Sequence, residues 1–375
     1  MKIYAFVNKG TDCYINSILQ AILTQYKFVN YLYIHRDKIM SQDTSSVVST
    51  GNVKAQLGVK LLKALTIVIY KLYYPEINMS SYTQTEHTAF NNLYRDYDKI
   101  TMNLETIQPV QIYMEDFRDV VTKNFGENFG PFYGQKDAHE FLNKLADFIS
   151  CGLIQLGLFT NNQKRFTIMD NLYSGSVYTQ IISQECKHSS TKNTYSEYFE
   201  LDVPINLDEY SKKPLPDGTD IQTYINEHFK DVQLNGDNKW YCEECSKNKN
   251  LPLQKNQNQN HYKQAIMKTF VGNTPEVLTV LLKRFDNNGK KIRKKVIVNK
   301  NITINSIKGK ITYTLHSAII HYGNTLLSGH YISLVKYFND EWFLCNDTKI
   351  NREQEFDISC GLNSSDTYIV FYKKV

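Results

Sequence analysis

The chain has 375 residues, of which 42% are hydrophobic and 22% are charged, and its net charge is +5. A chain of this length can form roughly two to three lobes with buried cores. Its 17 glycines and 8 prolines exclude a collagen-like or Pro/Gly-rich disordered chain. The charge excess is too small to indicate nucleic-acid binding by itself.

The first third of the sequence is predicted to be helical. One apolar stripe at helical spacing comprises Ile15, Ile18, Leu19, Ile22 and Leu23. A second helix, which Pro75 ends, is predicted from Leu57, Leu61, Leu65, Val68 and Leu72. A third helix begins near Gln135, with its stripe at Ala138, Phe141, Leu142, Leu145 and Phe148. The polar segment 76–111 between them shows no clear pattern.

From about residue 165 the pattern changes to that of β-strands. Residues 198–205 alternate as in a half-buried strand, and 277–282 form the short apolar run of a buried strand. Further strands are predicted at 311–320, 331–337, 341–345 and 367–372. The polar, low-complexity stretch 246–261 is predicted to be a flexible loop. A helical N-terminal lobe followed by a β-rich lobe makes an α+β protein.

The cysteines are odd in number and irregularly spaced, which indicates free or metal-bound thiols in a reducing compartment. They are Cys13, Cys151, Cys186, Cys242, Cys245, Cys345 and Cys360. The N-terminus has no signal-peptide pattern, and no stretch reaches about 18 uncharged apolar residues. We therefore expect a soluble, monomeric intracellular protein of the cytoplasm, the nucleus or both, with no membrane or nucleic-acid partner.

Cys13 lies just before the first apolar stripe, after the good N-cap residues Thr11 and Asp12. A thiol in a first helical turn feels the positive end of the helix dipole, which favours the thiolate. This indicates a nucleophile. The alternative, a small buried residue near a helix start, is equally compatible with this segment alone.

A cysteine nucleophile needs a base and a group that orients the base. His330 follows a Ser-Gly pair and opens directly into a predicted strand, where a side chain is held rigidly yet stays accessible. If strands 331–337 and 341–345 form a hairpin, Asn346 returns beside His330 and can fix its tautomer. A lone histidine next to glycine is otherwise more often structural.

Six sequence boxes in order resemble those of the ubiquitin-specific proteases, a papain-like cysteine peptidase family. The cysteine box is NKGTDCYINSILQ at 8–20, and the second box is YGQKDAHEFL at 133–142. A strand motif, PEVLTVLLKRF, follows at 275–285. The histidine box is HYG at 321–323 with GHY at 329–331, and the last two boxes are at 342–347 and 368–372. Together they span nearly the whole chain.

The resemblance implies a papain-like cysteine peptidase fold in a thumb–palm–fingers arrangement. One catalytic domain would cover residues 1–375, with a helical thumb at about 1–165, fingers at about 170–275 and a β-rich palm at about 276–375. The implied activity is that of a deubiquitinase, which hydrolyses the (iso)peptide bond after the C-terminal glycine of ubiquitin. Its partners would be ubiquitin and ubiquitinated proteins.

The resemblance also assigns roles to individual residues. Cys13 would be the nucleophile and His330 the base; Asn346 would orient His330, and Asp347 can share that role. Asn8 would help form the oxyanion hole, where one donor contributes on the order of 3 kcal/mol. The channel for the ubiquitin tail would be lined by Gln135, Asp137, Arg284, Phe285 and His321. Asp137 suits an arginine of that tail.

Two departures from the family pattern lie close to these residues. Thr11-Asp12 stands where the family has Asn-Thr, which places a carboxylate beside the thiol. A nearby negative charge opposes thiolate formation, so lower activity or a shifted pH optimum is expected. Cys345 replaces the usual Phe before the third catalytic position. Neither change removes a catalytic atom, and we expect an active enzyme.

The pair Cys242 and Cys245 forms a C-x-x-C, which alone fits a redox motif or half of a zinc site. In the fingers of the resembling family two such pairs form a zinc ribbon. Cys186 matches the first upstream cysteine, but the second is Ser189, a poor zinc ligand. His188 can supply the fourth ligand instead, giving a structural zinc site. The alternative is a finger that has lost its metal and is held by packing alone.

Other readings stay open. A protease of the same fold could act on another ubiquitin-like modifier, or the chain could be a weakly active ubiquitin-binding module. The basic run 290–295 is compatible with a nucleic-acid or nuclear-import patch, but a solvated turn is favoured because it directly follows the strand at 277–285.

Overall fold

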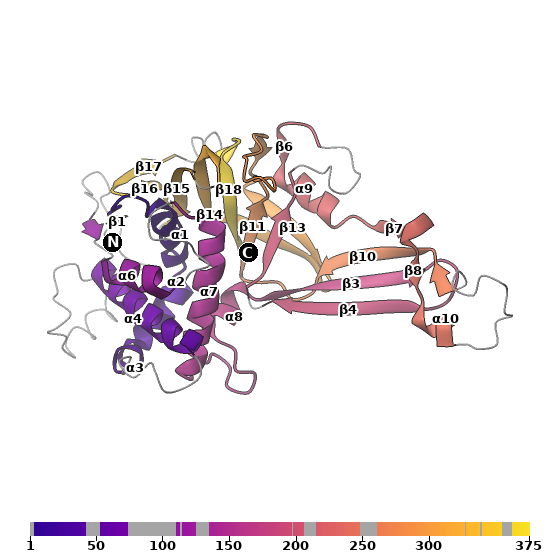
Figure 1. Cartoon of the computed structure of the whole chain (residues 1–375), viewed down its shortest axis with the longest axis horizontal. Coiled ribbons are helices and arrows are strands. Elements are labelled where there is room, and N and C mark those ends of the chain that lie inside the picture. The colour runs from indigo at the N-terminus through magenta and orange to yellow at the C-terminus, as the bar shows by residue number, and fades with distance from the viewer. Residues whose placement is uncertain are drawn as a thin grey trace.

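The computed structural model describes residues 4–42, 53–73, 110–112, 115–124, 135–196, 198–205, 215–247, 261–326, 328–337, 340–354 and 362–375. Helices fill one end of the molecule, strands occupy its middle, and a ribbon of long strands projects from the other end (Figure 1). Most of the unassigned segment 76–111, most of the predicted loop 246–261, and Cys360 lie outside the described residues.

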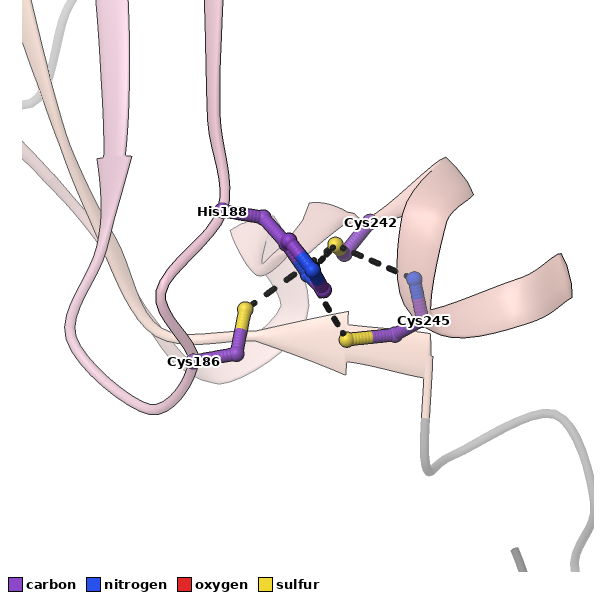
Figure 2. A group of neighbouring side chains, drawn as sticks. All are labelled: Cys186, His188, Cys242 and Cys245. Atoms are coloured by element: carbon purple, nitrogen blue, oxygen red, sulfur yellow. Dashed lines mark hydrogen bonds between the residues drawn. The ribbon is translucent and has the colours of Figure 1, made fainter. Parts of the chain in front are cut away.

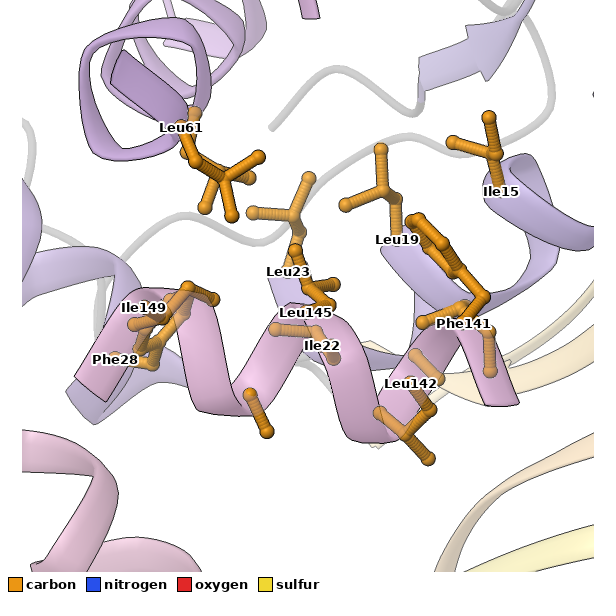
Figure 3. Close-up of a cluster of buried hydrophobic side chains, with 14 of the residues drawn as sticks. Ile15, Leu19, Ile22, Leu23, Phe28, Leu61, Phe141, Leu142, Leu145 and Ile149 are labelled. Carbon is orange, nitrogen blue, oxygen red and sulfur yellow. The ribbon is translucent and has the colours of Figure 1, made fainter. Parts of the chain in front are cut away.

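The helical end is built around two helices that the sequence predicts. These are α1 (Cys13–Leu23), which is buried along its whole length, and α7 (Ala138–Gln155). Their apolar stripes face each other, with side chains of neighbouring helices filling the gaps (Figure 3). The other helices here are α2 (Tyr26–Ile34), α3 (Arg36–Met40), α4 (Val53–Tyr73), α6 (Glu115–Asn124) and α8 (Ile168–Tyr173).

Helices α4 and α7 cross at a pair of glycines. A Cβ atom on Gly58 would lie 2.3 Å from the carbonyl oxygen of Phe148, and one on Gly152 would lie 2.5 Å from the carbonyl carbon of Gly58. No side chain fits in that space, so the two backbones touch directly. Among the described residues no helix is long and apolar enough to cross a membrane.

A large mixed sheet forms the middle of the molecule. Its main path runs β17-β16-β15-β14-β13-β10-β3-β4, and β11, β18, β5 and β7 pair beside it. Its strands outside the projecting ribbon are β5 (Glu200–Val203), β11 (Val277–Leu282), β13 (Asn301–Ser306), β14 (Gly309–Thr325), β15 (Ser328–Lys336), β16 (Trp342–Asn346), β17 (Lys349–Glu353) and β18 (Thr367–Lys374). The predicted hairpin is confirmed, because β15 pairs antiparallel with β16 and places Ser333 opposite Cys345.

The projecting ribbon consists of β3 (Gly175–Ser183), β4 (Ser189–Ser196) and β10 (Ala265–Val271), with β7 (Val232–Leu234) along part of β10. Its tip carries β8 (Trp240–Tyr241), α10 (Glu243–Lys247) and β9 (Tyr262–Lys263) (Figure 1). Smaller elements complete the described chain: β1 (Tyr4–Phe6) with β2 (Val110–Ile112), β6 (Thr219–Asp220) with β12 (Val296–Ile297), α9 (Ile221–His228) and a 3-10 turn, Gly236–Asn238.

The core lies on both faces of strand β11, which explains why its sequence is apolar apart from the buried Thr279. Val277 and Leu281 belong to the cluster that includes the helices, whereas Leu278, Val280 and Leu282 belong to a second cluster on the other face. All six residues of the strand are buried. A strand covered on both faces has no polar side, so its sequence does not alternate.

Candidate active site and metal cluster

Cys13 begins helix α1, as predicted, and its side chain is buried. Asp12 occupies the N-cap position, but its carboxylate makes no capping hydrogen bond. Oδ2 of Asp12 instead accepts from the backbone N–H of Lys9 at 3.1 Å, and Oδ1 lies 3.1 Å from Nε of Arg118 on α6. The carboxylate beside the thiol is therefore paired with a guanidinium.

His330 stands near the start of β15 and is half-buried. Its Nε2 lies 2.7 Å from Oδ1 of Asn346, which can only accept, so Nε2 carries a proton and Nδ1 is the basic nitrogen. The pKa of His330 is raised to about 9, chiefly by a hydrogen bond with the Cys13 thiol. The Asn346 bond and the Asp347 charge add to this rise, against the lowering caused by burial. The imidazolium is thus stabilised beside the thiol.

Asp347 ties two distant parts of the chain together. Its carboxylate accepts from Nδ2 of Asn8 at 2.9 Å and from Nδ2 of Asn16 at 2.7 Å, while Nε2 of His330 lies 3.9 Å away. The backbone of Asp347 has a φ of +50°, a strained conformation for this residue that aims its side chain. Its main contacts are therefore the two asparagines, and its charge acts on His330 from a greater distance.

The side chain of Asn8 is fixed at both ends. Its Oδ1 accepts from the backbone N–H groups of Gly10 at 2.9 Å and Asp12 at 3.1 Å, while Nδ2 donates to Asp347. The loop before α1 is thereby folded around this amide. Asn16, one turn into α1, was missed as a functional residue. Its place in the cysteine box gave the only sequence signal.

Asp137 is the N-cap residue of α7, where Oδ1 accepts from the N–H of Glu140 at 2.8 Å. Its Oδ2 accepts from the hydroxyl of Tyr368 at 2.9 Å and lies 3.4 Å from that of Tyr331. Burial raises the pKa of Asp137, and these hydrogen bonds oppose the rise. The carboxylate joins the helical end to the sheet, and contact with an arginine of a substrate tail stays a prediction.

A cavity of about 600 Å³ opens between α7 and the sheet. Its lining includes Asp137, His139, Glu140, Lys283, Phe285 and Tyr368. The ring of Phe285 packs edge-on against that of Tyr368, with 5.3 Å between the ring centroids. Its centroid lies 5.5 Å from that of the His321 ring. Gln135 lies just before Asp137, and its buried Nε2 has no hydrogen-bond partner among the described residues. Phe285 and Asp137 thus both line this cavity, and their contact with a ubiquitin tail stays a prediction.

Two predicted tail contacts, Arg284 and His321, are buried in the structure, and their contact with a tail stays a prediction. Arg284 is among the residues that line the cavity, and its guanidinium donates to the backbone carbonyls of Ile292, Lys294, Ser364 and Thr367. These four carbonyls hold it in place. The ring of His321 is also fully buried, below Gly323 and Gly329, where a Cβ atom would meet it at 2.8 and 2.6 Å. Burial lowers the pKa of His321 to about 4, so the ring is neutral.

The basic run 290–295 is not simply a solvated turn. Lys291 is buried, and its ammonium donates to the carboxylate of Asp366 at 2.5 Å and to the backbone carbonyl of His321. The backbone of this run also bonds to the end of β14, since the N–H of Lys291 donates to the carbonyl of Asn324 at 2.9 Å. The run is thereby joined to the strand that carries His321.

At the tip of the ribbon, Cys186, His188, Cys242 and Cys245 point toward one another (Figure 2). Their ligand atoms all lie within 4.8 Å of one another. The Sγ atoms of Cys186 and Cys242 are 3.9 Å apart, and Nδ1 of His188 is 3.3 Å from the Sγ atoms of both Cys242 and Cys245. Tetrahedral zinc would place such atoms roughly 3.5–3.8 Å apart. The group could hold a metal ion.

The sequence matches the protein family described as ubiquitin carboxyl-terminal hydrolase over residues 4–372. Ubiquitin carboxyl-terminal hydrolase 23 of Arabidopsis thaliana is 24% identical over 248 residues, 64% of this chain and 25% of that protein. Ubiquitin carboxyl-terminal hydrolase 13 of Saccharomyces cerevisiae is 27% identical over 259 residues, 64% of this chain and 32% of that protein. The chain thus spans a quarter to a third of these relatives.

The fold resembles that of the solved SAGA Ubp8/Sgf11/Sus1/Sgf73 DUB module bound to ubiquitin aldehyde. The TM-score is 0.67 at 20% sequence identity, covering 100% of this chain and 70% of that one. At this identity the likeness establishes the fold alone. It confirms the α+β, papain-like fold that the sequence predicts.

Proposed function

The chain belongs to the ubiquitin carboxyl-terminal hydrolase family, and on this basis we propose that it is a cysteine-type deubiquitinase. The observation that carries the proposal is the arrangement of Cys13, His330 and Asn346. A thiol at a helix N-terminus lies beside an imidazole whose far nitrogen is held by an amide oxygen. This is the geometry of thiol-dependent acyl transfer.

In the proposed reaction the Sγ of Cys13 attacks the carbonyl carbon of the C-terminal glycine of ubiquitin, and the thiol proton resides on His330. The imidazolium then protonates the leaving amine, which departs and leaves a thioester. Water, deprotonated by His330, attacks the thioester and frees both the ubiquitin carboxylate and the thiol. Asn8, held by Gly10, Asp12 and Asp347, would donate its second Nδ2 hydrogen to the developing oxyanion.

The substrate side of the proposal rests on the cavity and the ribbon. The cavity lined by Asp137 and Phe285 would take the flexible C-terminal tail of ubiquitin. The ribbon, as the fingers at about 170–275, would hold its globular body, between a thumb at about 1–165 and a palm at about 276–375. Ubiquitinated proteins would be the physiological substrates of a monomeric enzyme. Another ubiquitin-like modifier is the competing substrate class.

We also propose that Cys186, His188, Cys242 and Cys245 bind a structural zinc ion. Three thiols and one imidazole make a complete tetrahedral ligand set, which leaves no position for a catalytic water. The metal would join the β3–β4 turn to α10. Such a thiolate site needs a reducing environment, which supports an intracellular location.

Intact-mass analysis with an electrophilic ubiquitin C-terminal probe tests the activity. Wild-type protein should gain the mass of one ubiquitin, and Cys13→Ala should gain none. Cys151→Ala is the matched control, because it removes a different, partly exposed thiol and should still react. If no adduct forms with ubiquitin while a probe built on another modifier reacts, the competing substrate class is correct. If folded wild-type protein reacts with neither, the enzymatic proposal is wrong.

A further inference from the structure

Beside the nucleophile lies an ion pair that the catalytic geometry does not require. The carboxylate of Asp12, which directly precedes Cys13, has a side-chain exposure of 9% and lies 3.1 Å from Nε of Arg118. Arg118 belongs to α6, a helix that contributes no residue to the reaction proposed above. The sequence showed the carboxylate as a departure, but nothing in it pointed to the arginine.

The charge of Asp12 acts directly on the reaction. A carboxylate adjacent to a thiol disfavours the thiolate, and burial strengthens the effect because little water screens it. A guanidinium within ion-pair distance cancels most of this field. Asp12 precedes Cys13 in the chain, whereas His330 approaches from β15, so the field of Asp12 acts more strongly on the thiolate than on the imidazolium.

The carboxylate also has a positioning role that would explain its presence. Its Oδ2 accepts from the N–H of Lys9, within the loop that folds around the Asn8 amide. A carboxylate there organises the loop but, without a counter-charge, would weaken the nucleophile. Arg118 removes this conflict.

We propose that Arg118 is a positioning residue of the active site, which neutralises Asp12 and thereby keeps Cys13 reactive at neutral pH. This inference rests on the proposed function of Cys13 as the nucleophile. Arg118 acts through Asp12 and touches no reacting atom. The charge of Arg118 thus links helix α6 to the reactivity of the Cys13 thiol.

Other titratable groups also face the thiol and stay unchanged in the test. Among the described residues they are His330 and Tyr331 on β15 and Tyr14 on α1, and Asp347, after β16, acts on His330. Asp12 and Arg118 form the remaining pair. Because the variants below alter only this last pair, any shift in the pH dependence of Cys13 is assigned to it.

The test is the pH dependence of Cys13 alkylation by iodoacetamide, followed by mass spectrometry of the peptide that contains Cys13. This reagent needs no ubiquitin, so its result is separate from that of the ubiquitin probe. Arg118→Gln should move the midpoint of the profile to higher pH by roughly half a unit to one unit. Asp12→Asn should move it to lower pH, because the guanidinium of Arg118 is then unopposed, and the double variant, which lacks both charges, should return it close to the wild-type value.

Arg352→Gln is the matched control, because it also removes a guanidinium from an ion pair, with Glu341, at a partly exposed site. It should leave the profile of Cys13 unchanged. Arg118→Lys should restore most of the wild-type profile, which a purely shape-dependent role of arginine would not allow. A profile of Arg118→Gln that superimposes on wild type overturns the proposal, as does a double variant shifted as far upward as Arg118→Gln. If Arg118→Gln does not fold, Asp12→Asn decides the question. A profile of Asp12→Asn that does not move to lower pH then overturns the proposal.

Discussion

Among the described residues, cysteine and histidine side chains come together at Cys13 and at Cys186, in different surroundings. At Cys13 one thiol meets one imidazole, and the network links residues as far apart in sequence as Asn8 and Asp347. At the ribbon tip three thiols and an imidazole converge, joining the β3–β4 turn to α10. The first arrangement gives the thiol a proton acceptor, whereas the second offers a full set of four ligands for the proposed metal ion.

The two sites also differ in what holds them in place. Helix α1 is buried along its whole length, and β15 contributes to the same core, so packing fixes the positions of Cys13 and His330. Strand β4 is exposed along nearly all of its length, and α10 has no buried residue. A tip without a core needs ligand bonds to be rigid. We infer that packing holds the residues of the first site in place, and that the proposed metal would take over this role at the second.

The largest effect is expected when the base is removed from the site around Cys13. His330→Gln should lower kcat/KM for a fluorogenic ubiquitin substrate by about a thousandfold or more, because the thiol loses its proton acceptor. The melting temperature should change little, since the half-exposed ring carries little of the core. Steady-state kinetics and thermal unfolding measure the two. A large fall in melting temperature would show that this site is not held by packing alone.

Metal removal should affect the other site first. Cys242→Ser, or a strong zinc chelator, should lower the melting temperature by on the order of 5 °C and raise KM for the ubiquitin substrate. Alkylation of Cys13 by iodoacetamide should keep its wild-type rate, because the core around α1 is intact. The matched variant Cys151→Ser should change neither the melting temperature nor KM. Unchanged stability after chelation would favour a tip held by packing.

A smaller effect is expected for the carboxylate that positions two amides. Asp347→Ala should lower kcat by about a hundredfold with little change in KM, because Asn8 and Asn16 lose their acceptor. Asp347→Asn keeps one acceptor oxygen and should lose less. Equal losses in both variants would mean that Asp347 acts mainly through the effect of its negative charge on His330, and not through its hydrogen bond to Asn8.

The smallest effect is expected in the pH dependence of kcat/KM, which the pKa of His330 sets. With the pKa of His330 raised to about 9, kcat/KM should fall above that pH, as the imidazolium loses the proton that the leaving amine needs. The same raised pKa stabilises the folded state, fully at pH values below the unfolded value near 6.5 and less as pH rises through about 9. Asn346→Ala should move the alkaline limb to lower pH in a kcat/KM profile, and an unmoved limb would contradict this assignment.

Local patterns predict much of this architecture. The apolar stripes that face each other in α1 and α7, the apolar run of β11 and the β15–β16 hairpin follow from side-chain periodicity, and the hairpin alone brings Asn346 to His330. The order of boxes then identifies which cysteine and histidine to pair. These features depend on residues near one another in sequence.

The sequence fails where charged residues are buried. Lys291 lies in a run predicted to be a solvated turn, and the sequence predicts that Arg284 lines a channel. Both are buried, and their cationic groups donate to backbone carbonyls inside the protein. Buried charges are rare and depend on partners from distant segments, such as Asp366 for Lys291, so no local pattern reveals them. The pairing of Asp12 with Arg118 was hidden for the same reason.

The glycine crossing of α4 and α7 bears on attempts to engineer this protein. Replacing helical glycine with alanine usually stabilises a helix by about 0.5–1 kcal/mol, and stability design therefore favours it. At Gly58 and Gly152 the added methyl would strike backbone atoms of the opposite helix, so the usual gain turns into a loss. Helix α7 also carries Asp137, which is bound to the strand tyrosines, so a displaced α7 would disturb the sheet beside His330. These two positions should stay fixed in any redesign.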